Sequence, residues 1–519
     1  MTVRDLDTRG AGETGLGSLV SKFDPVASIE SAGGPVPTRN FAEIAIGGKS
    51  GGGQSPRFHN RDEELDEVLD GLTKEHGEHF WFVIAPPQLG KSWFLQRISD
   101  RMSARWSSWV VRRVDLRAMP AEITGDADAL VQAMFGQADR SATGPADPRE
   151  LAINILSYGK SHLCTLDSAE LLDDKTIGAL RQRVGEINQH VEDAKNPNVH
   201  LALIVASRRD PHWIGITPRP RLRRLPLSEF KVDVIFKALR ELAVSMGHKF
   251  GDDQLHPYAD LVHRASEGLP ALLVGYLTWI RDAQWVELQR LETQASFDQL
   301  ARPYIENDLL SASSLVGWGR TVTSERRAAL EQALKALVPY RLFTQSHLSH
   351  HAMNGDLHQA LRAQDWSVAQ LWIAVSGTDL LYRPQGEPWH EINAPIRRLL
   401  FRHWYPSDEL RARAHRNARQ FVQSFFGGEL GPHQPVILVE CLWHEAEACR
   451  VLASNEMEED LIRLARRLSA GLVSYSAFRQ EDLRVWAVER MRGDQELANA
   501  VDGAAGLFDR LIDAVKRPV

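Results

Sequence analysis

Cysteine is scarce in this chain of 519 residues, which excludes a disulfide framework. The three cysteines, Cys164, Cys441 and Cys449, are scattered without the spacing of a metal site. We expect them to be reduced thiols, as is usual in the cytosol. No apolar run has the length of a membrane span, and the N-terminus has no apolar signal core. The sequence therefore predicts a soluble cytoplasmic protein with no membrane partner.

An excess of positive charge is also missing. The formal net charge is −7, which excludes a chain-wide basic surface for nucleic acid. Hydrophobic residues make up 43% of the chain and charged residues 25%, as in ordinary globular proteins. The length favours three or four domains.

Residues 1–56 contain 11 of the 37 glycines, and we expect a flexible leader there. The leader is too short and too polar for a catalytic effector domain, so we interpret it as a docking tail. It contains Gly48-Lys49-Ser50, but three glycines follow directly. Three glycines begin a helix poorly, and we interpret this motif as linker.

The segment from Phe80 to Arg97 predicts a strand, a tight loop and a helix. Phe80–Ile84 is an apolar run of strand length, and Trp93 opens a run with helical spacing. A loop ending in Gly-Lys-Ser between a strand and a helix is typical of a phosphate-binding loop. The alternative is an ordinary strand-turn-helix. The loop residues are Ala85, Pro86, Pro87, Gln88, Leu89, Gly90, Lys91 and Ser92, with Ala85 in place of the usual first glycine.

These residue types suit phosphate chemistry. Backbone N–H groups of the loop and of the helix start hold phosphate oxygens. Gly90 lets the backbone come close, Lys91 reaches the β- and γ-phosphates, and Ser92 can ligate Mg²⁺. The predicted cofactors are therefore ATP or ADP with Mg²⁺.

A second strand, residues 161–167, ends in Asp167, where a Mg²⁺-organising carboxylate is expected. The alternative is that Asp167 only caps the next turn. Ser168 stands where many efficient ATPases carry a water-polarising glutamate, and Glu170 is the nearest candidate for that role. We therefore expect slow hydrolysis, which suits a switch better than a motor.

A third strand, residues 200–206, leads into Arg208 and Arg209. Cations at the tip of a strand beside the phosphate strand are well placed to sense the γ-phosphate, although surface arginines are the alternative. A basic turn offers either a second phosphate contact or a solvated loop; it contains Arg219, Arg221, Arg223 and Arg224.

The remaining chain divides by its patterns. We expect an α/β P-loop NTPase core with a parallel sheet at 57–225, a helical lid at 226–320, a winged helix at 321–406 and an all-α domain at 407–519. The winged helix is predicted from helices that flank two short strands around 380–392. A corner at Gly268-Leu269-Pro270 interrupts the lid helices.

The order of these motifs resembles the signal-transducing ATPases with numerous domains (STAND), the AAA+-related class that includes NACHT and NB-ARC proteins. The resemblance covers roughly residues 56–405. It implies that Asn60 and Arg61 lie against the adenine and that Pro270 packs on the base. It also implies phosphate and metal contacts along the loop from Ala85 to Trp93 and at Asp167, with Arg208 or Arg209 as first sensor. A winged-helix histidine that contacts ADP in this family corresponds here to Asn393, with His390 nearby.

The resemblance implies a switch. ADP would hold the core, winged helix and C-terminal region closed, and a trigger would permit exchange for ATP and formation of a homo-oligomer. Because the chain has no recognisable effector of its own, a separate effector protein is expected, and a bacterial defence role is a family expectation.

Two alternatives remain open. A DNA-handling AAA+ ATPase is favoured by one arginine-rich run, although its helices are apolar and the chain is acidic overall; DNA is the less expected partner. The run contains Arg397, Arg398, Arg402, Arg411, Arg413, Arg416 and Arg419. A nucleotide-bound scaffold without turnover is favoured by the missing acid at position 168.

Overall fold

The computed structural model describes most of the chain after residue 60. It covers residues 61–73, 80–85, 89–136, 147–196, 198–208, 222–311, 315, 323–353, 355–378, 380–383, 388–426, 433–454, 456–476, 478–502 and 506–518. The predicted leader lies outside these ranges. So do several predicted site residues: Asn60, Pro86, Pro87, Gln88, Arg209, Arg219 and Arg221.

Five parallel strands form one sheet in the order β2-β3-β4-β1-β5. Every residue of β3 and β4 is buried, as expected for central strands covered on both faces. The strand that precedes the phosphate loop, β1, lies between β4 and β5. The bounds are β1 Phe80–Ile84, β2 Trp109–Asp115, β3 Ser161–Asp167, β4 Leu201–Ser207 and β5 Leu222–Pro226.

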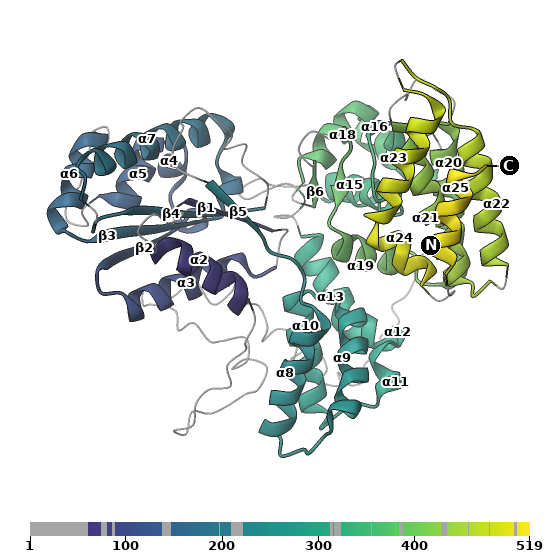
Figure 1. Cartoon of the computed structure of the whole chain (residues 1–519), viewed down its shortest axis with the longest axis horizontal. Coiled ribbons are helices and arrows are strands. Elements are labelled where there is room, and N and C mark those ends of the chain that lie inside the picture. Colours follow the sequence, from purple (N-terminus) through teal and green to yellow (C-terminus); the bar gives the residue numbers. More distant parts are fainter. Residues whose placement is uncertain are drawn as a thin grey trace, which may run out of the picture. The chain divides into compact units, whose positions relative to one another are not determined.

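Helices cover both faces of this sheet (Figure 1). Trp81 and Val83 of β1 pack in the core that contains α2 and α3, whereas Phe80 and Phe82 pack in the core that contains α5, α6 and α7. This alternation follows from the two-residue period of a strand. The helices of this part are α2 Asp62–Thr73, α3 Lys91–Arg105, α4 Ala121–Thr124, α5 Ala127–Phe135, α6 Pro148–Tyr158 and α7 Asp174–Asp193.

Short and long helices follow β5. The apolar spacing of the sequence predicts a helix at residues 257–265, but this start is wrong, because α9 begins at Asp252 and contains Pro257 inside it. Gly251 caps α9, and the Gln254 side chain accepts a hydrogen bond from its backbone N–H at 3.1 Å. Because of this cap the helix begins before Pro257, and the proline lies inside the helix and does not mark its start. The elements are α8 Val232–Ser245, α9 Asp252–Ser266, α10 Pro270–Asp282, α11 Leu288–Leu291, α12 Gln294–Ser296, η4 Phe297–Ala301, α13 Arg302–Tyr304 and η5 Ile305–Leu309.

The next segment combines helices with a small hairpin. Strands β6 and β7 pair antiparallel, and Phe343 forms an additional bridge with His390. The elements are α15 Ser324–Leu337, α16 Gln345–His351, α17 Gly355–Gln364, α18 Val368–Ser376, β6 Leu381–Tyr382, β7 Glu391–Ile392 and α19 Ala394–Trp404.

The C-terminal segment is helical, and α21 is buried along most of its length. Its helices are α20 Asp408–Ser424, α21 Gln434–Val451, α22 Met457–Ala470, α23 Gln480–Arg492, α24 Gln495–Val501 and α25 Leu507–Lys516. The predicted architecture is confirmed: an α/β core with a parallel sheet precedes helical segments. Among the described helices, none combines the length and apolarity needed to cross a membrane.

Candidate nucleotide-binding site

The turn from β1 into α3 contains the predicted phosphate loop. Gly90 precedes α3 with a φ of 83°, a left-handed conformation that favours glycine. A Cβ added at Gly90 meets no atom within 4 Å, so the demand for glycine is conformational and not steric. The first turn of α3 has no acidic residue, which leaves its positive end suited to an anion. Ser92 is exposed at the second position of α3.

The Lys91 side chain contacts the start of this turn. Its Nζ donates a hydrogen bond to the Ala85 carbonyl oxygen at 2.5 Å, and only 8% of the residue is exposed. Burial lowers the pKa of Lys91 to about 7, although Glu170 and Asp167 act in the opposite direction. The ammonium group is therefore a desolvated cation beside acidic groups at the carboxyl edge of the sheet. Ligands bind at this edge in open α/β sheets.

Asp167 ends β3 at this same edge and is 2% exposed. Its Oδ1 accepts a hydrogen bond from the Ser168 N–H at 2.8 Å, in a turn where Ser168 has a φ of 64°. The turn thus fixes the carboxylate at the strand tip. Among the described residues, no group of three or more His, Cys, Asp or Glu side chains could hold a metal.

Asp115 is a functional candidate that the sequence reasoning missed. It ends β2 and is the direct register partner of Asp167. Burial raises the pKa of Asp115, and Asp167 adds to this shift. The signal was present, since the sequence predicts strands at residues 109–116 and 161–167, and each has an aspartate at or next to its C-terminal end. Asp115 Oδ1 also accepts a hydrogen bond from the Arg117 N–H at 3.0 Å, so capping accounts for part of its role.

Glu170 and Arg208 form a buried pair. Arg208 Nε lies 2.9 Å from Glu170 Oε1, and the Arg208 backbone N–H donates to Oε2 at 3.1 Å. Arg117 Nη2 approaches the same carboxylate at 3.8 Å. The candidate for polarising water is thus tied to the candidate sensor at the tip of β4. An acid held this way is less available as a general base.

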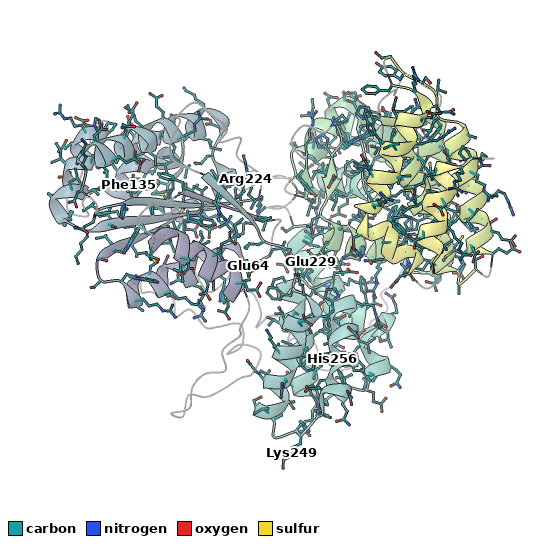
Figure 2. The ribbon with its side chains drawn as sticks, in the orientation of Figure 1. Glu64, Phe135, Arg224, Glu229, Lys249 and His256 are labelled. Atoms are coloured by element: carbon teal, nitrogen blue, oxygen red, sulfur yellow. The ribbon has the colours of Figure 1, made fainter. Side chains whose placement is uncertain are left out.

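Arg61 contacts the phosphate loop and the segment after β5. Its guanidinium donates to the carbonyl oxygens of Leu89, at 3.4 Å, and of Ser228, and its Cζ lies 5.2 Å from the centroid of the Phe230 ring. Burial lowers the pKa of Arg61, and Glu64 and Glu229 oppose this shift. Both acids are labelled in Figure 2, Glu64 on α2 and Glu229 in the segment between β5 and α8.

The corner before α10 is closely packed against this segment. Gly268 has a φ of 66°, and its carbonyl accepts a hydrogen bond from the Phe230 N–H at 2.8 Å. A Cβ at Gly268 would lie 2.6 Å from the Phe230 carbonyl oxygen, so glycine is required here. Pro270, the predicted base contact, is buried at the first position of α10.

His390 and Asn393 each carry a buried polar atom without a hydrogen-bond partner among the described residues. These atoms are His390 Nδ1 and Asn393 Oδ1. The main chain of His390 pairs with Phe343, and Asn393 precedes α19. Their predicted contact with nucleotide stays a prediction.

Comparisons with known proteins found no family model and no curated protein that matches the chain. Solved structures do match. They include a Walker-type ATPase of Pyrococcus abyssi, with 14% identity over 66% of this chain and 95% of that one and a TM-score of 0.41. The ORC2 protein of Aeropyrum pernix has 11% identity over 73% of this chain and 98% of its own, with a TM-score of 0.39. The Thermotoga maritima RuvB branch migration motor has 13% identity, 67% and 94% coverage and a TM-score of 0.31. Similarities this remote carry no argument about function, which has to rest on this chain's own residues.

Proposed function

We propose that the chain binds ATP and ADP with Mg²⁺ and works as a slow, AAA+-related ATPase switch. The observation that supports this most directly is the position of Lys91. Its buried ammonium stands at the start of α3 and interacts with Asp167 and Glu170 at the carboxyl edge of the sheet. A cation beside a backbone anion site and a buried carboxylate is the combination that a Mg²⁺–triphosphate requires.

The proposed roles follow from position. Lys91 and the start of α3 contact the β- and γ-phosphates, while Ser92 and Asp167 hold Mg²⁺ through their oxygens. Arg208 senses the γ-phosphate from the tip of β4. Pro270 and Arg61 border the base.

Slow turnover is supported by the ion pair of Glu170. A carboxylate that accepts hydrogen bonds from Arg208 is less free to take a proton from water than a solvated one. The nucleotide would then stay bound long enough to mark a state. We propose that the ADP form is closed and that exchange for ATP opens a homo-oligomerising form.

A STAND-type signalling role is the finer part of the proposal. In it, the C-terminal helices respond to a trigger protein, and a separate effector is recruited, in keeping with a defence function in bacteria. The motif order and the division into core, helices, hairpin and C-terminal helical segment support it.

The first experiment extracts nucleotide from the purified protein with acid and identifies it by chromatography. We expect about one ADP per chain, and Lys91→Ala to lose it because the phosphate charge is no longer balanced. The matched control is Lys175→Ala, which removes an exposed lysine on α7. Retention of nucleotide by Lys91→Ala would contradict the site, as would an equal loss in Lys175→Ala.

The DNA-handling alternative is weakened by the arginine-rich run. Four of its seven arginines pair with carboxylates of this chain: Arg397 with Glu496, Arg398 with Glu267, Arg411 with Asp408 and Arg419 with Glu445. Arg402 lies over the Phe297 ring, with Cζ 4.8 Å from its centroid. Arginines held in this way are not free to neutralise DNA phosphates.

A further inference from the structure

Three arginines next to the β6–β7 hairpin form a cluster with carboxylates from distant parts of the chain. We call Arg341, Arg397 and Arg398 the arginine cluster. Its ion pairs are Arg341 with Glu440 at 2.7 Å, Arg341 with Asp494 at 2.7 Å, Arg341 with Glu496 at 3.7 Å, Arg397 with Glu496 at 2.7 Å, Arg398 with Glu496 at 3.2 Å and Arg398 with Glu267 at 2.6 Å.

The Trp443 ring fixes two members of this cluster. Arg341 and Arg397 lie over it with Cζ at 4.6 and 4.9 Å from the ring centroid. Cations over the face of tryptophan are attracted by its quadrupole, more so when water is excluded. The side chains of Arg341 and Arg397 are only 10% and 5% exposed. Little water is therefore available to screen the charges of Arg341 and Arg397 when a carboxylate leaves.

Asp494 and Glu496, at the start of α24, supply two of the four carboxylates. Asp494 also accepts the hydrogen bond that caps α24, from Leu497 N–H at 2.9 Å. Burial acts to raise the pKa of Glu496, but Arg397, Arg341 and Arg398 outweigh it and hold the pKa below its ordinary value. Without the two α24 carboxylates, three arginines would face only Glu267 and Glu440. Uncompensated buried charge is costly, so the arginines would repel one another and move apart.

Arg398 connects the ion pairs of α24 to the candidate nucleotide site. It shares its guanidinium between Glu496 and Glu267, and Glu267 directly precedes Gly268. The Gly268 carbonyl oxygen accepts a hydrogen bond from the Phe230 N–H, and the Phe230 ring lies under the Arg61 guanidinium. Arg61 in turn donates to Leu89 of the phosphate loop. Contacts between neighbouring residues thus run without a break from α24 to Leu89, the residue before Gly90.

We propose that α24 slows nucleotide exchange through the charges of Asp494 and Glu496, and we call this arrangement the charge clasp. While Asp494 and Glu496 are in place, Arg398 holds Glu267 and the corner up to Pro270 against the phosphate loop. When a protein partner draws α24 away, the corner loosens and the nucleotide leaves faster. This rests on the proposed nucleotide site and names the element that controls it.

The test compares Glu496→Gln with Glu458→Gln in the full-length chain. Both changes remove one carboxylate charge from the C-terminal helices, but Glu458 pairs with Arg510 at the surface and lies outside the arginine cluster. Release of a fluorescent ADP analogue is measured after addition of excess unlabelled ADP. We expect Glu496→Gln to release it between about 5-fold and 100-fold faster than wild type, within the range of allosteric coupling, and Glu458→Gln to match wild type. Equal release rates in all three proteins would overturn the clasp.

A second measurement does not depend on nucleotide. The amides of Gly268 and Leu269 donate to the carbonyls of His263 and Ser266 at 3.2 and 3.0 Å, so their hydrogen exchange reports on the corner. The clasp requires faster exchange there in Glu496→Gln than in Glu458→Gln. Unchanged exchange would overturn it even if the protein binds no nucleotide. A wild-type chain without nucleotide affinity, but with the exchange difference, would instead contradict the proposed site and leave the coupling of α24 to the corner standing.

Because loss of the Glu496 charge leaves buried arginines uncompensated and can prevent folding, Asp494→Asn is a second variant, with its fold checked by circular dichroism. It removes charge from the same helix at a residue that contacts only Arg341 of the cluster. We expect a smaller acceleration of release in the same direction. No acceleration in a folded Asp494→Asn protein, together with none in Glu496→Gln, would show that the cluster is structural only.

Discussion

At the scale of single residues, Lys91 makes stability depend on pH. In the folded chain its pKa is lowered to about 7, whereas in the unfolded chain it is near 10.5. Between these values the unfolded state binds more protons, so this lysine makes the folded state more stable as pH rises from about 7 towards 10.5. The slope is at most about 1.4 kcal/mol per pH unit for one proton.

We expect Lys91→Met to lose this slope. The free energy of unfolding by urea is measured between pH 7.5 and 9 for wild type and variant, and the difference isolates Lys91 from all other groups. Saturating Mg²⁺–ADP should flatten the wild-type curve, because phosphate keeps the lysine charged. Parallel pH profiles for wild type and variant would show that the ammonium is not desolvated.

The two acids after β3 are predicted to differ. Asp167→Ala should weaken Mg²⁺-dependent ATP binding by about 10-fold or more, as loss of a metal-site group does, whereas Glu170→Ala should have a much smaller effect. The reason is that Glu170 is already occupied by Arg208. Titrations of each variant with ATP, with and without Mg²⁺, measure the two losses of affinity. Equal losses of affinity would mean that Asp167 is wrongly assigned as the metal-binding carboxylate.

At the scale of elements, the corner before α10 allows a matched pair of glycine substitutions. Gly268→Ala should destabilise the chain by about 1–3 kcal/mol, because Ala disfavours a positive φ and its Cβ would meet the Phe230 carbonyl at 2.6 Å. Gly275→Ala, inside α10 with open space at its Cβ, should stabilise by roughly 0.5–1 kcal/mol. Chemical denaturation of both variants measures their free energies of unfolding. An unchanged free energy of unfolding in Gly268→Ala would contradict the close packing of the corner.

The elements themselves could largely be predicted from sequence, because their signals are local. An apolar run marks β1, and aspartate at position 167 marks the end of β3, each within a few residues. The start of α9 was missed because Pro257 is a stronger local signal than the Gly251 cap.

The pairings within the site could not be predicted. Glu170 and Arg208 lie 38 residues apart, and Glu267 and Arg398 lie 131 apart. Many arginines and acids in the chain are equally suitable partners by type, and only the fold selects among them. Asp115 was missed for the same reason, since its importance comes from the register of β2 with β3.

At the scale of the whole molecule, we expect weak binding to duplex DNA at physiological salt. Most of the arginine-rich run is internally paired, and Arg413 and Arg416 are its exposed members. Fluorescence anisotropy with a duplex at about 0.15 M salt measures the affinity, with Arg413→Ser and Arg416→Ser as variants. Tight binding that both variants abolish would favour the DNA-handling alternative.

The pairing of Arg398 with both Glu267 and Glu496 also bears on synthesis. The two acids are separated by about 230 residues, so a ribosome makes Glu496 roughly 10 to 50 seconds after Glu267. In the later part of that interval, once Arg397 and Arg398 have been made, the nascent chain has a complete phosphate loop and corner but lacks Glu496, which pairs with both arginines. The growing polypeptide therefore passes through a stage in which Arg397 has not yet received its partner Glu496, and that stage is where assistance from a chaperone would matter most.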